Sequence, residues 1–245
     1  MKKRFQALLL VFALIMLCCP VMPAIADTTD GSQDTENQKV VCIDAGHQTH
    51  ANLGQEPIGP GSSTTKYKVT GGASGCVTHV PEYKLNLRMA KKLRKELKAR
   101  GYKVVMTRTK NNVNITNIER AKIANEANAD VFIRIHANSS ESSSTKGALT
   151  CAPTSNNPFL SKKIRKKSQK LSKIVLNSFC SATGAKNCSV MYTDSMTGIN
   201  WCTVPVTIME MGFMSNPDED RLMQTEEYQA KMVQGMADGI DEFLS

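Results

Sequence analysis

Short apolar runs alternate with longer amphipathic segments along most of this 245-residue chain. The runs are rich in Val and Ile and have the length of buried strands, whereas the longer segments repeat apolar residues every three or four positions, as helices do. This pattern predicts strands at 39–44, 102–107, 130–136, 147–152 and 204–210. It predicts helices at 81–101, 115–129 and 158–179, and a closing helix near the C-terminus that packs on the sheet.

Strands that alternate with helices indicate an α/β fold. We expect a single domain with a mixed, mostly parallel sheet flanked by helices. One segment, 48–78, interrupts the alternation, because it is rich in Gly, Ser and Thr and has no apolar period. Unstructured segments this long are usually lids or binding loops, so we expect a functional loop here.

The N-terminus has the pattern of an export signal. Three basic residues at 2–4 precede an apolar stretch over 7–21 and a small-x-small site at 24–26. The pattern predicts cleavage after Ala26 and a secreted protein, extracellular or held in the cell wall; the alternative is an uncleaved membrane anchor. The expected organisation is a signal peptide over 1–26, a disordered leader over 27–38 and one folded domain over 39–245.

Net charge narrows the choice of partner. The formal charge is +9, and removing a signal with three positive charges and no acidic residue leaves about +6. A basic exported protein suits anionic surfaces such as wall polymers, whereas export and an aromatic content of 5% disfavour nucleic acid. The densest basic stretch, 162–173, is either the solvated face of a helix or a patch that binds anionic wall polymers. We expect a monomer.

Cysteines do not supply a metal site in this sequence. Six remain after the signal, and no two have CxxC spacing, which disfavours thiolate ligation of zinc. Export permits disulfides, and Cys180 and Cys188 are close enough in sequence to bridge across a turn. Cys42 lies inside an expected strand and is interpreted as a small buried apolar residue.

Histidine and glutamate mark the ends of several expected elements. His47 ends the run 40–47, His136 ends 131–136 and Glu210 ends 204–210. Glu82 opens the helix that follows the long loop. Because ligand sites lie at the carboxyl ends of strands in such sheets, these four groups should converge on one edge. Two imidazoles and a carboxylate suit a catalytic zinc with one position left for water, and a further carboxylate can move protons, so the pattern predicts a zinc hydrolase.

Other residues compete for these roles. His50 lies three residues beyond His47 and is a rival ligand, and Glu56 is a rival to Glu82. Asp44 could orient His47 from behind, or it could form a turn.

Four segments of the chain resemble, in order, the motifs of the zinc-dependent N-acetylmuramoyl-L-alanine amidases of the amidase-3 type. They are DAGH (44–47), PEYKLNL (81–87), IHANSS (135–140) and VPVTIMEMGFMSNPDED (204–220). The resemblance implies hydrolysis of the amide between N-acetylmuramic acid and L-alanine in peptidoglycan. It also implies that His47, Glu82 and His136 bind Zn²⁺ and that Glu210 is the catalytic carboxylate. The chain departs from the family pattern at Gln48, where Gly usually follows the His, and in the length of the loop over 48–78.

Three further residues are candidates for contact with substrate. Trp201 could stack on a sugar or peptide at the edge of the cleft, or it could anchor its loop to the core. Asn200 precedes it in the same segment, and Asn138 could donate a hydrogen bond near the metal. Two other functions remain open: a zinc peptidase that cuts within the stem peptide, and a non-catalytic wall-binding relative. The latter would usually have lost a ligand or the base, and none is missing here.

Overall fold

The computed structural model describes residues 38–245. The predicted signal peptide, its cleavage site and almost all of the predicted leader lie outside the described residues. Within residues 38–245, no helix is both long and apolar enough to cross a membrane.

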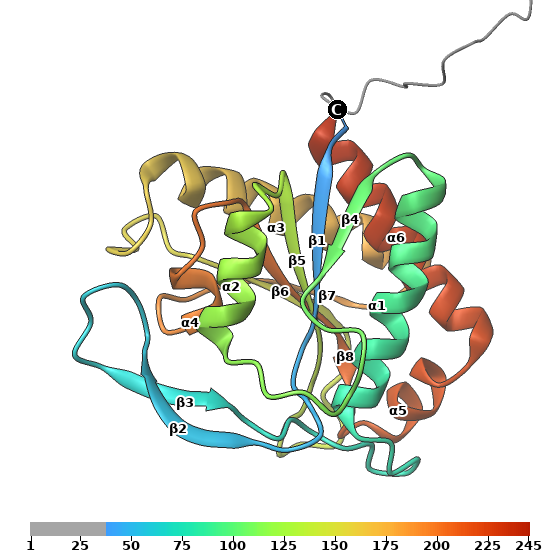
Figure 1. The fold of residues 1–245 in the computed structure, drawn as a ribbon. Helices are drawn as coiled ribbons and strands as arrows, with labels where there is room; N and C mark the ends of the chain where they lie inside the picture. Colours follow the sequence, from blue (N-terminus) through green and yellow to red (C-terminus); the bar gives the residue numbers. More distant parts are fainter. Residues whose placement is uncertain (1–37) are drawn as a thin grey trace, which may run out of the picture. The chain divides into compact units, whose positions relative to one another are not determined.

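A six-stranded sheet forms the centre of the fold, with helices on both faces (Figure 1). Its strands, in spatial order, are β4 (Lys103–Met106), β1 (Val40–Ala45), β5 (Val131–Asn138), β8 (Val206–Phe213), β6 (Ala148–Ala152) and β7 (Asn187–Tyr192). The first four are parallel to one another, and β6 pairs antiparallel with β8. β7 pairs parallel with β6 and therefore also runs against the first four. The sheet is mixed and mostly parallel, as the alternation of elements predicts.

Two hydrophobic clusters hold the helices against the sheet. The larger one joins the sheet to α1 (Glu82–Ala99), α3 (Lys162–Thr183) and α6 (Glu226–Leu244). The smaller one lies on the other face, beneath α2 (Asn117–Glu126) and α4 (Thr197–Asn200). A short helix, α5 (Pro217–Met223), connects β8 to α6. Residues at alternate positions of β5 enter different clusters, since Ile133 and Ile135 face α1 and Phe132 faces α2.

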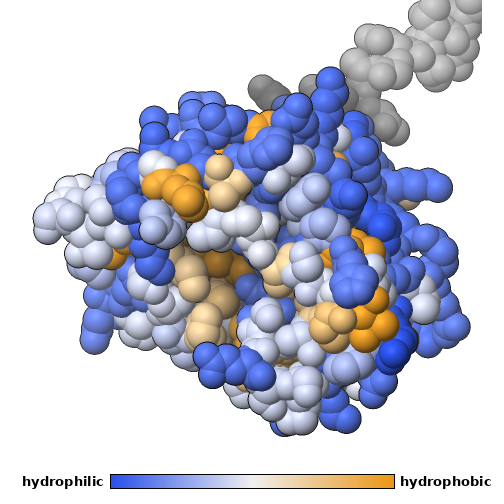
Figure 2. Space-filling model, turned by 90° about the horizontal axis from the view of Figure 1, so that it is seen from below, coloured by the Kyte–Doolittle hydropathy of each residue, from blue (hydrophilic) through white to orange (hydrophobic). Residues whose placement is uncertain are grey.

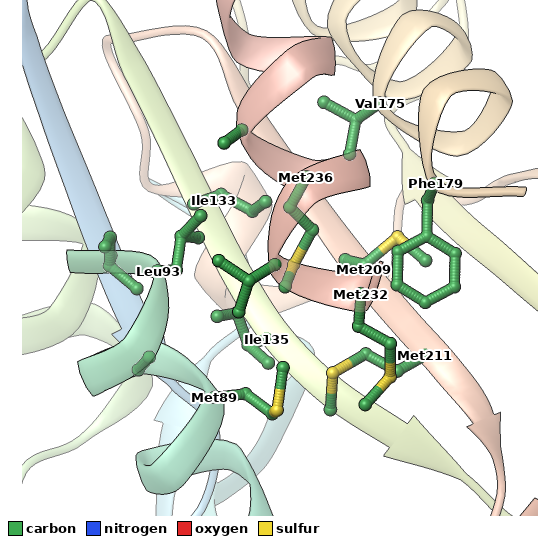
Figure 3. Packing of buried hydrophobic residues seen from close by; sticks show 14 of the residues in the cluster. Met89, Leu93, Ile133, Ile135, Val175, Phe179, Met209, Met211, Met232 and Met236 are labelled. Carbon is green, nitrogen blue, oxygen red and sulfur yellow. The ribbon is translucent and has the colours of Figure 1, made fainter. Parts of the chain in front are cut away.

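Methionines fill much of the larger cluster. Figure 3 shows Met232 and Met236 of α6 beside Met209 and Met211 of β8, with Phe179 of α3 next to them. Methionine is flexible and adapts to irregular gaps between elements, which suits the junction of three helices and a sheet. The closing helix thus packs between α1 and α3, and its methionines reach the sheet as expected.

The segment over 48–78 is more ordered than its composition predicts. It contains an antiparallel hairpin, β2 (Asn52–Pro57) and β3 (Thr65–Val69). Most hairpin residues are exposed, so no alternation of apolar side chains reveals the strands. β7 was not predicted for the same reason, because it is a largely exposed edge strand with no apolar run.

All six cysteines in the described part of the chain are unpaired. Cys180, in the last turn of α3, and Cys188, in β7, are therefore not bridged in this structure. Cys42 is fully buried in β1, in agreement with its interpretation as a small apolar residue.

Candidate metal centre

The candidate site lies where two crossover connections diverge. From β1 the chain passes through α1 to β4, and from β4 it returns through α2 to β5 on the opposite side of β1. The ends of β1 and β5 therefore flank a topological switch point, where α/β sheets form ligand sites. His47 follows β1 by two residues, while His136 of β5 is the register partner of Glu210 on β8.

His47, Glu82 and His136 form a compact cluster that could hold a metal ion. One potential ligand atom from each residue lies within 4.8 Å of the others. Nε2 of His47 is 3.2 Å from Oε2 of Glu82, and Nδ1 of His136 is 3.1 Å from Oε1. The two imidazole rings meet edge to face with their centroids 4.8 Å apart. Two imidazoles and one carboxylate at this separation suit a divalent transition metal.

Helix α1 and the neighbouring backbone orient the carboxylate of Glu82. The backbone N–H of Ala73 donates to Oε2 at 2.8 Å. The N–H of Ala137 and the side-chain amide of Asn86 donate to Oε1, each at 3.1 Å. Glu82 is also the first residue of α1, where the helix dipole favours a negative charge. The sequence motif does not predict this role of Asn86. Its position four residues after Glu82 places both side chains on the same face of the helix and could have indicated it.

Two buried atoms of the site, one in the cluster and one beside it, have no hydrogen-bond partner within residues 38–245. Nδ1 of His47 lies 2.9 Å from the backbone oxygen of Thr70, so this ring is held through one nitrogen while the other faces Glu82. In contrast, Nε2 of His136 and Oε2 of Glu210 are buried and have no partner among the described residues. Because buried polar atoms are nearly always paired, these two atoms indicate that a group from outside the chain completes the site.

The two carboxyl groups of the site have opposite pKa shifts. Burial alone would raise the pKa of Glu82, but hydrogen bonds with His136 and His47 outweigh it and hold that pKa well below its usual range. Burial raises the pKa of Glu210 to about 8, an effect that the charge of Glu82 increases and that of Arg134 opposes. With these opposite shifts, the ionised carboxylate of Glu82 could bind a metal while the carboxyl group of Glu210 accepts and releases a proton.

Close packing around the cluster requires a glycine. Gly72 has a positive φ of 78°, and a Cβ at this position would lie 2.7 Å from Oε2 of Glu82 and 2.9 Å from Cγ of His47. Both the backbone conformation and the contact exclude a side chain here. The segment after β3 can therefore cover the cluster only because residue 72 is glycine.

Asp44 has neither of the roles expected from the sequence. It does not orient His47 and it is not in a turn; it lies inside β1, fully buried. Its oxygens accept from Nη1 of Arg120 at 2.7 Å and from Nε of Arg134 at 2.9 Å. Burial alone would raise the pKa of Asp44, but the two guanidinium charges outweigh it and lower the pKa. Asp44 thus anchors two buried arginines beneath the site.

Two of the three residues expected to contact substrate make structural hydrogen bonds. Asn200 is buried, and its amide donates to the backbone oxygens of Ile58 and Asp194 while its oxygen accepts from Asn157. Nε1 of Trp201 donates to the backbone oxygen of Pro57 at 3.0 Å. Asn200 and Trp201 therefore hold the hairpin and the neighbouring loops in place; neither lines the cavity described below, and their contact with substrate stays a prediction. Trp201 has its alternative role, that of an anchor.

Asn138 lies beside the cluster, whereas the two rival ligands, His50 and Glu56, lie outside it. Asn138 lines a small hollow together with all three residues of the cluster, so it stays a candidate for contact with substrate. His50 is exposed and lines a separate hollow. Oε2 of Glu56 faces the backbone N–H of Ile118, in the first turn of α2. Neither of these two residues belongs to the cluster of His47, Glu82 and His136.

Gln48 stands where the chain departs from the family pattern, and its buried side chain holds the start of the segment 48–78 against the body of the domain. It is 1% exposed, and its side-chain oxygen accepts from the backbone N–H of Ile115 and from Arg120. The substitution of Gly by Gln therefore changes the support of the loop and not the lining of the site.

A cavity of about 560 Å³ leads to the cluster. Figure 2 views the molecule from the side where the parallel strands end, and a hollow with partly apolar walls is visible there. The hairpin supplies one wall through Gln55, Lys66 and Tyr67, and the start of α4 supplies the other through Met196 and Gly198. His47, His136, Glu210 and Arg134 also line the cavity. Its volume suits a small peptide or sugar segment.

Comparison with known proteins identifies the family. Residues 41–242 match the model of the family described as Amidase_3, N-acetylmuramoyl-L-alanine amidase. This match covers most of the chain, and the chain belongs to this family.

Individual relatives agree with this assignment. The N-acetylmuramoyl-L-alanine amidase LytC of Bacillus subtilis is 29% identical over 158 residues, which are 64% of this chain and 30% of LytC. The chain thus spans less than a third of the length of that relative. The catalytic domain of CwlV, an N-acetylmuramoyl-L-alanine amidase from Bacillus (Paenibacillus) polymyxa var. colistinus, is 31% identical with a TM-score of 0.67, covering 84% of this chain and 98% of that one.

A more distant structure shares the fold. The N-acetylmuramyl-L-alanine amidase Ami1 from Mycobacterium smegmatis superposes with a TM-score of 0.76 at 22% identity, covering 84% of this chain and 96% of that one.

Proposed function

We propose that this protein hydrolyses the amide bond between N-acetylmuramic acid and L-alanine in peptidoglycan. The observation that carries the proposal is the cluster of His47, Glu82 and His136 beside Glu210, in a chain of the Amidase_3 family. The amidase relatives named above support the same bond as the target. Peptidoglycan lies outside the cytoplasm, so the proposal agrees with export of the chain to the cell wall or the medium.

Zn²⁺ is the metal that we propose for the cluster. Two neutral imidazoles and one carboxylate are a common ligand set of catalytic zinc, and the unpartnered Nε2 of His136 fits a site that needs an external group. When bound, zinc would polarise the amide carbonyl and lower the pKa of a water molecule. His47, Glu82 and His136 would hold the ion, and Asn86, Ala73 and Thr70 would keep the ligands in orientation.

Glu210 is proposed to carry the proton. Its Oε2 is buried beside the cluster and has no partner among the described residues, so this oxygen is free to accept a proton from the attacking water. The carboxyl group would then deliver the proton to the departing nitrogen of L-alanine, which must be protonated to leave as an amine. The raised pKa, about 8, suits a group that must both accept and release a proton near neutrality.

The decisive experiment compares the parent with Glu210→Gln, both loaded with zinc, on purified peptidoglycan. New amino termini are labelled and identified, and elemental analysis measures the zinc. We expect the parent to release the amino group of L-alanine, and the variant to keep its zinc while losing at least about 1,000-fold in rate. New termini on any other residue would instead indicate a peptidase that cuts within the stem peptide. A Gln variant that retains the parent rate would refute the role of Glu210.

A matched variant tests the ligand set. His136→Ala should lose zinc as well as activity, because one of three protein ligands is removed. His50→Ala is the control, since this exposed histidine lies three residues beyond His47 and outside the cluster. Full zinc occupancy in the His136 variant would contradict the assignment, as would loss of zinc in the control.

Helix α3 is proposed to bind anionic wall polymers. Helix α3 contains no acidic residue. Six of its lysines are exposed: Lys162, Lys163, Lys166, Lys167, Lys170 and Lys173. Like charges one turn apart repel one another, so an anionic polymer bound along this face would relieve the repulsion.

A further inference from the structure

Arg134 is a buried cation within the candidate active-site cavity. It lies in β5, two residues before His136, is 4% exposed, and lines the cavity together with Glu210. Because side chains alternate along a strand, Arg134 and His136 project from the same face of the sheet. The sequence motif does not predict a role for Arg134, although a charged residue between the apolar residues of a buried strand is itself unusual.

The guanidinium of Arg134 is held firmly but keeps one nitrogen free. Nε donates to Oδ2 of Asp44 at 2.9 Å, and Nη2 donates to Oδ1 of Asn117 at 2.7 Å. Nη1 has no hydrogen-bond acceptor among residues 38–245. These two contacts fix the plane of the guanidinium, so the remaining nitrogen is presented in a defined direction without further loss of entropy.

Three buried arginines lie beneath the cavity with one aspartate among them. Asp44 supplies a single negative charge and shares it between Arg120 and Arg134. Arg108 adds a third buried guanidinium, but its hydrogen bonds go to backbone oxygens and to the amide of Asn111. The other carboxylates nearby, those of Glu82 and Glu210, belong to the site above, so Nη1 of Arg134 remains a charged donor that faces the cavity and favours an anionic ligand.

The opposite wall leaves room for this guanidinium. A Cβ at Gly198 would collide with Nη1 and Cζ of Arg134, so the end of the side chain lies directly against the glycine. Gly198 lines the same cavity, in the first turn of α4. Any side chain at this position would displace Nη1, which means that the glycine keeps the nitrogen accessible.

The distance from the metal-binding cluster suggests which anion would reach Arg134. Two residues of strand span about 6.6 Å, so this is roughly the offset of Arg134 from His136 along β5. Consecutive Cα atoms of a peptide are about 3.8 Å apart. In an extended peptide, a carboxylate on the residue after L-alanine therefore lies about 7 Å from the scissile carbonyl carbon, a length of the same order as this backbone offset.

We propose that Arg134, through Nη1, binds the α-carboxylate of the stem-peptide residue that follows L-alanine and so selects substrates with a free carboxylate there. This proposal rests on the amidase function proposed above. It assigns Arg134 to substrate specificity rather than to metal binding or proton transfer.

The test uses two N-acetylmuramoyl-L-alanyl peptides that differ only in having a free α-carboxylate or a carboxamide on the residue after L-alanine. Their affinities for zinc-loaded Glu210→Gln protein are measured by calorimetry, so that no cleavage occurs. We expect the carboxylate peptide to bind about 10- to 100-fold more tightly, as for a charge-assisted hydrogen bond to a buried arginine. Adding Arg134→Gln should reduce the ratio of the two affinities to less than about threefold.

Two more variants keep the test decisive. Gly198→Ala should also reduce the ratio while leaving every charge in place, and it serves if the Arg134 variant does not fold. Lys66→Gln removes an exposed cation from the same cavity and should leave the ratio unchanged. Equal affinities in the Glu210→Gln background, or a ratio that survives both Arg134→Gln and Gly198→Ala, would overturn the proposal, as would a ratio lost only with Lys66→Gln.

Failure of the amidase function is recognised separately. If the parent cleaves neither peptide between the lactyl group and L-alanine, the proposed function is wrong. Binding to the inactive protein still decides whether Arg134 recognises the carboxylate.

Discussion

Asp44→Asn should destabilise the fold strongly although it changes only one atom. Asp44 is fully buried and pairs with Arg120 and Arg134, whose side chains are 1% and 4% exposed. The amide keeps the shape of the carboxylate but leaves two buried guanidinium groups without their counter-charge. Breaking one buried ion pair from one side costs about 3–5 kcal/mol, and the two pairs share one carboxylate, so we expect about 4 kcal/mol in total. For a domain of this size, that corresponds to a fall in melting temperature of about 8–16 °C.

The pH dependence of this loss follows from the sign of the pKa shift. The pKa of Asp44 is lower in the folded protein than its ordinary value of 3.8. The stabilisation is therefore fully present above that ordinary value and is lost as the pH falls towards the lower folded pKa. The gap in unfolding free energy between parent and variant should be constant from pH 5 to 8 and should narrow below about pH 4.

Urea and thermal unfolding of both proteins, with a metal chelator present, measure this gap without a contribution from metal binding. Asp218→Asn is the matched control, because Asp218 is 98% exposed and lies 3.8 Å from Arg221; this change should cost less than about 1 kcal/mol. An Asp44 variant as stable as the parent at pH 7, or a gap that stays unchanged down to pH 3, would refute the reasoning.

Three further predictions concern the metal, the glycine that covers it and the basic helix. Saturation with zinc at about 1,000 times its dissociation constant should stabilise the domain by about 4 kcal/mol in calorimetric unfolding, and a chelator should reverse this; an unchanged melting temperature would contradict a preformed site. Gly72→Val should weaken zinc binding at least tenfold in a competition titration, because its side chain would occupy the space of Glu82 and His47, whereas the same change at Gly61, which has open space around it, should not. Replacing the six exposed lysines of α3 with glutamine should abolish the salt dependence of wall binding and leave hydrolysis of a short soluble substrate intact; wall binding with the parent's salt dependence would exclude the patch.

Sequence patterns predict the elements of this fold that are buried and miss those that are exposed. β1, β5 and β8 were recognisable because each has a run of Val and Ile with both faces covered. β7 and the hairpin were not, because backbone pairing and contacts with distant loops hold them, and neither leaves a period in the sequence.

The same distinction applies to the site. His47, Glu82, His136 and Glu210 could be placed together because each stands at the end of a recognisable element. Contacts between segments far apart in the sequence could not be predicted in this way. Asn200 illustrates the difference, since its amide binds Ile58, 142 positions away, and only the folded chain reveals that this side chain is fully used.

The hairpin of β2 and β3 shapes the cleft but supplies none of the groups proposed to carry out its chemistry. It forms one wall of the cavity, yet it contributes none of the three proposed metal ligands and not Glu210. Hydrogen bonds attach it to the body at both ends: Asn114 and Asn117 bind it near its base, and Trp201 and Asn200 bind it where β2 enters the connecting loop. A change in its length or sequence can therefore widen, narrow or recharge the cleft while the reacting groups keep their positions. In engineering, this makes the hairpin the natural place to graft loops that would redirect the proposed amidase to differently cross-linked peptidoglycan.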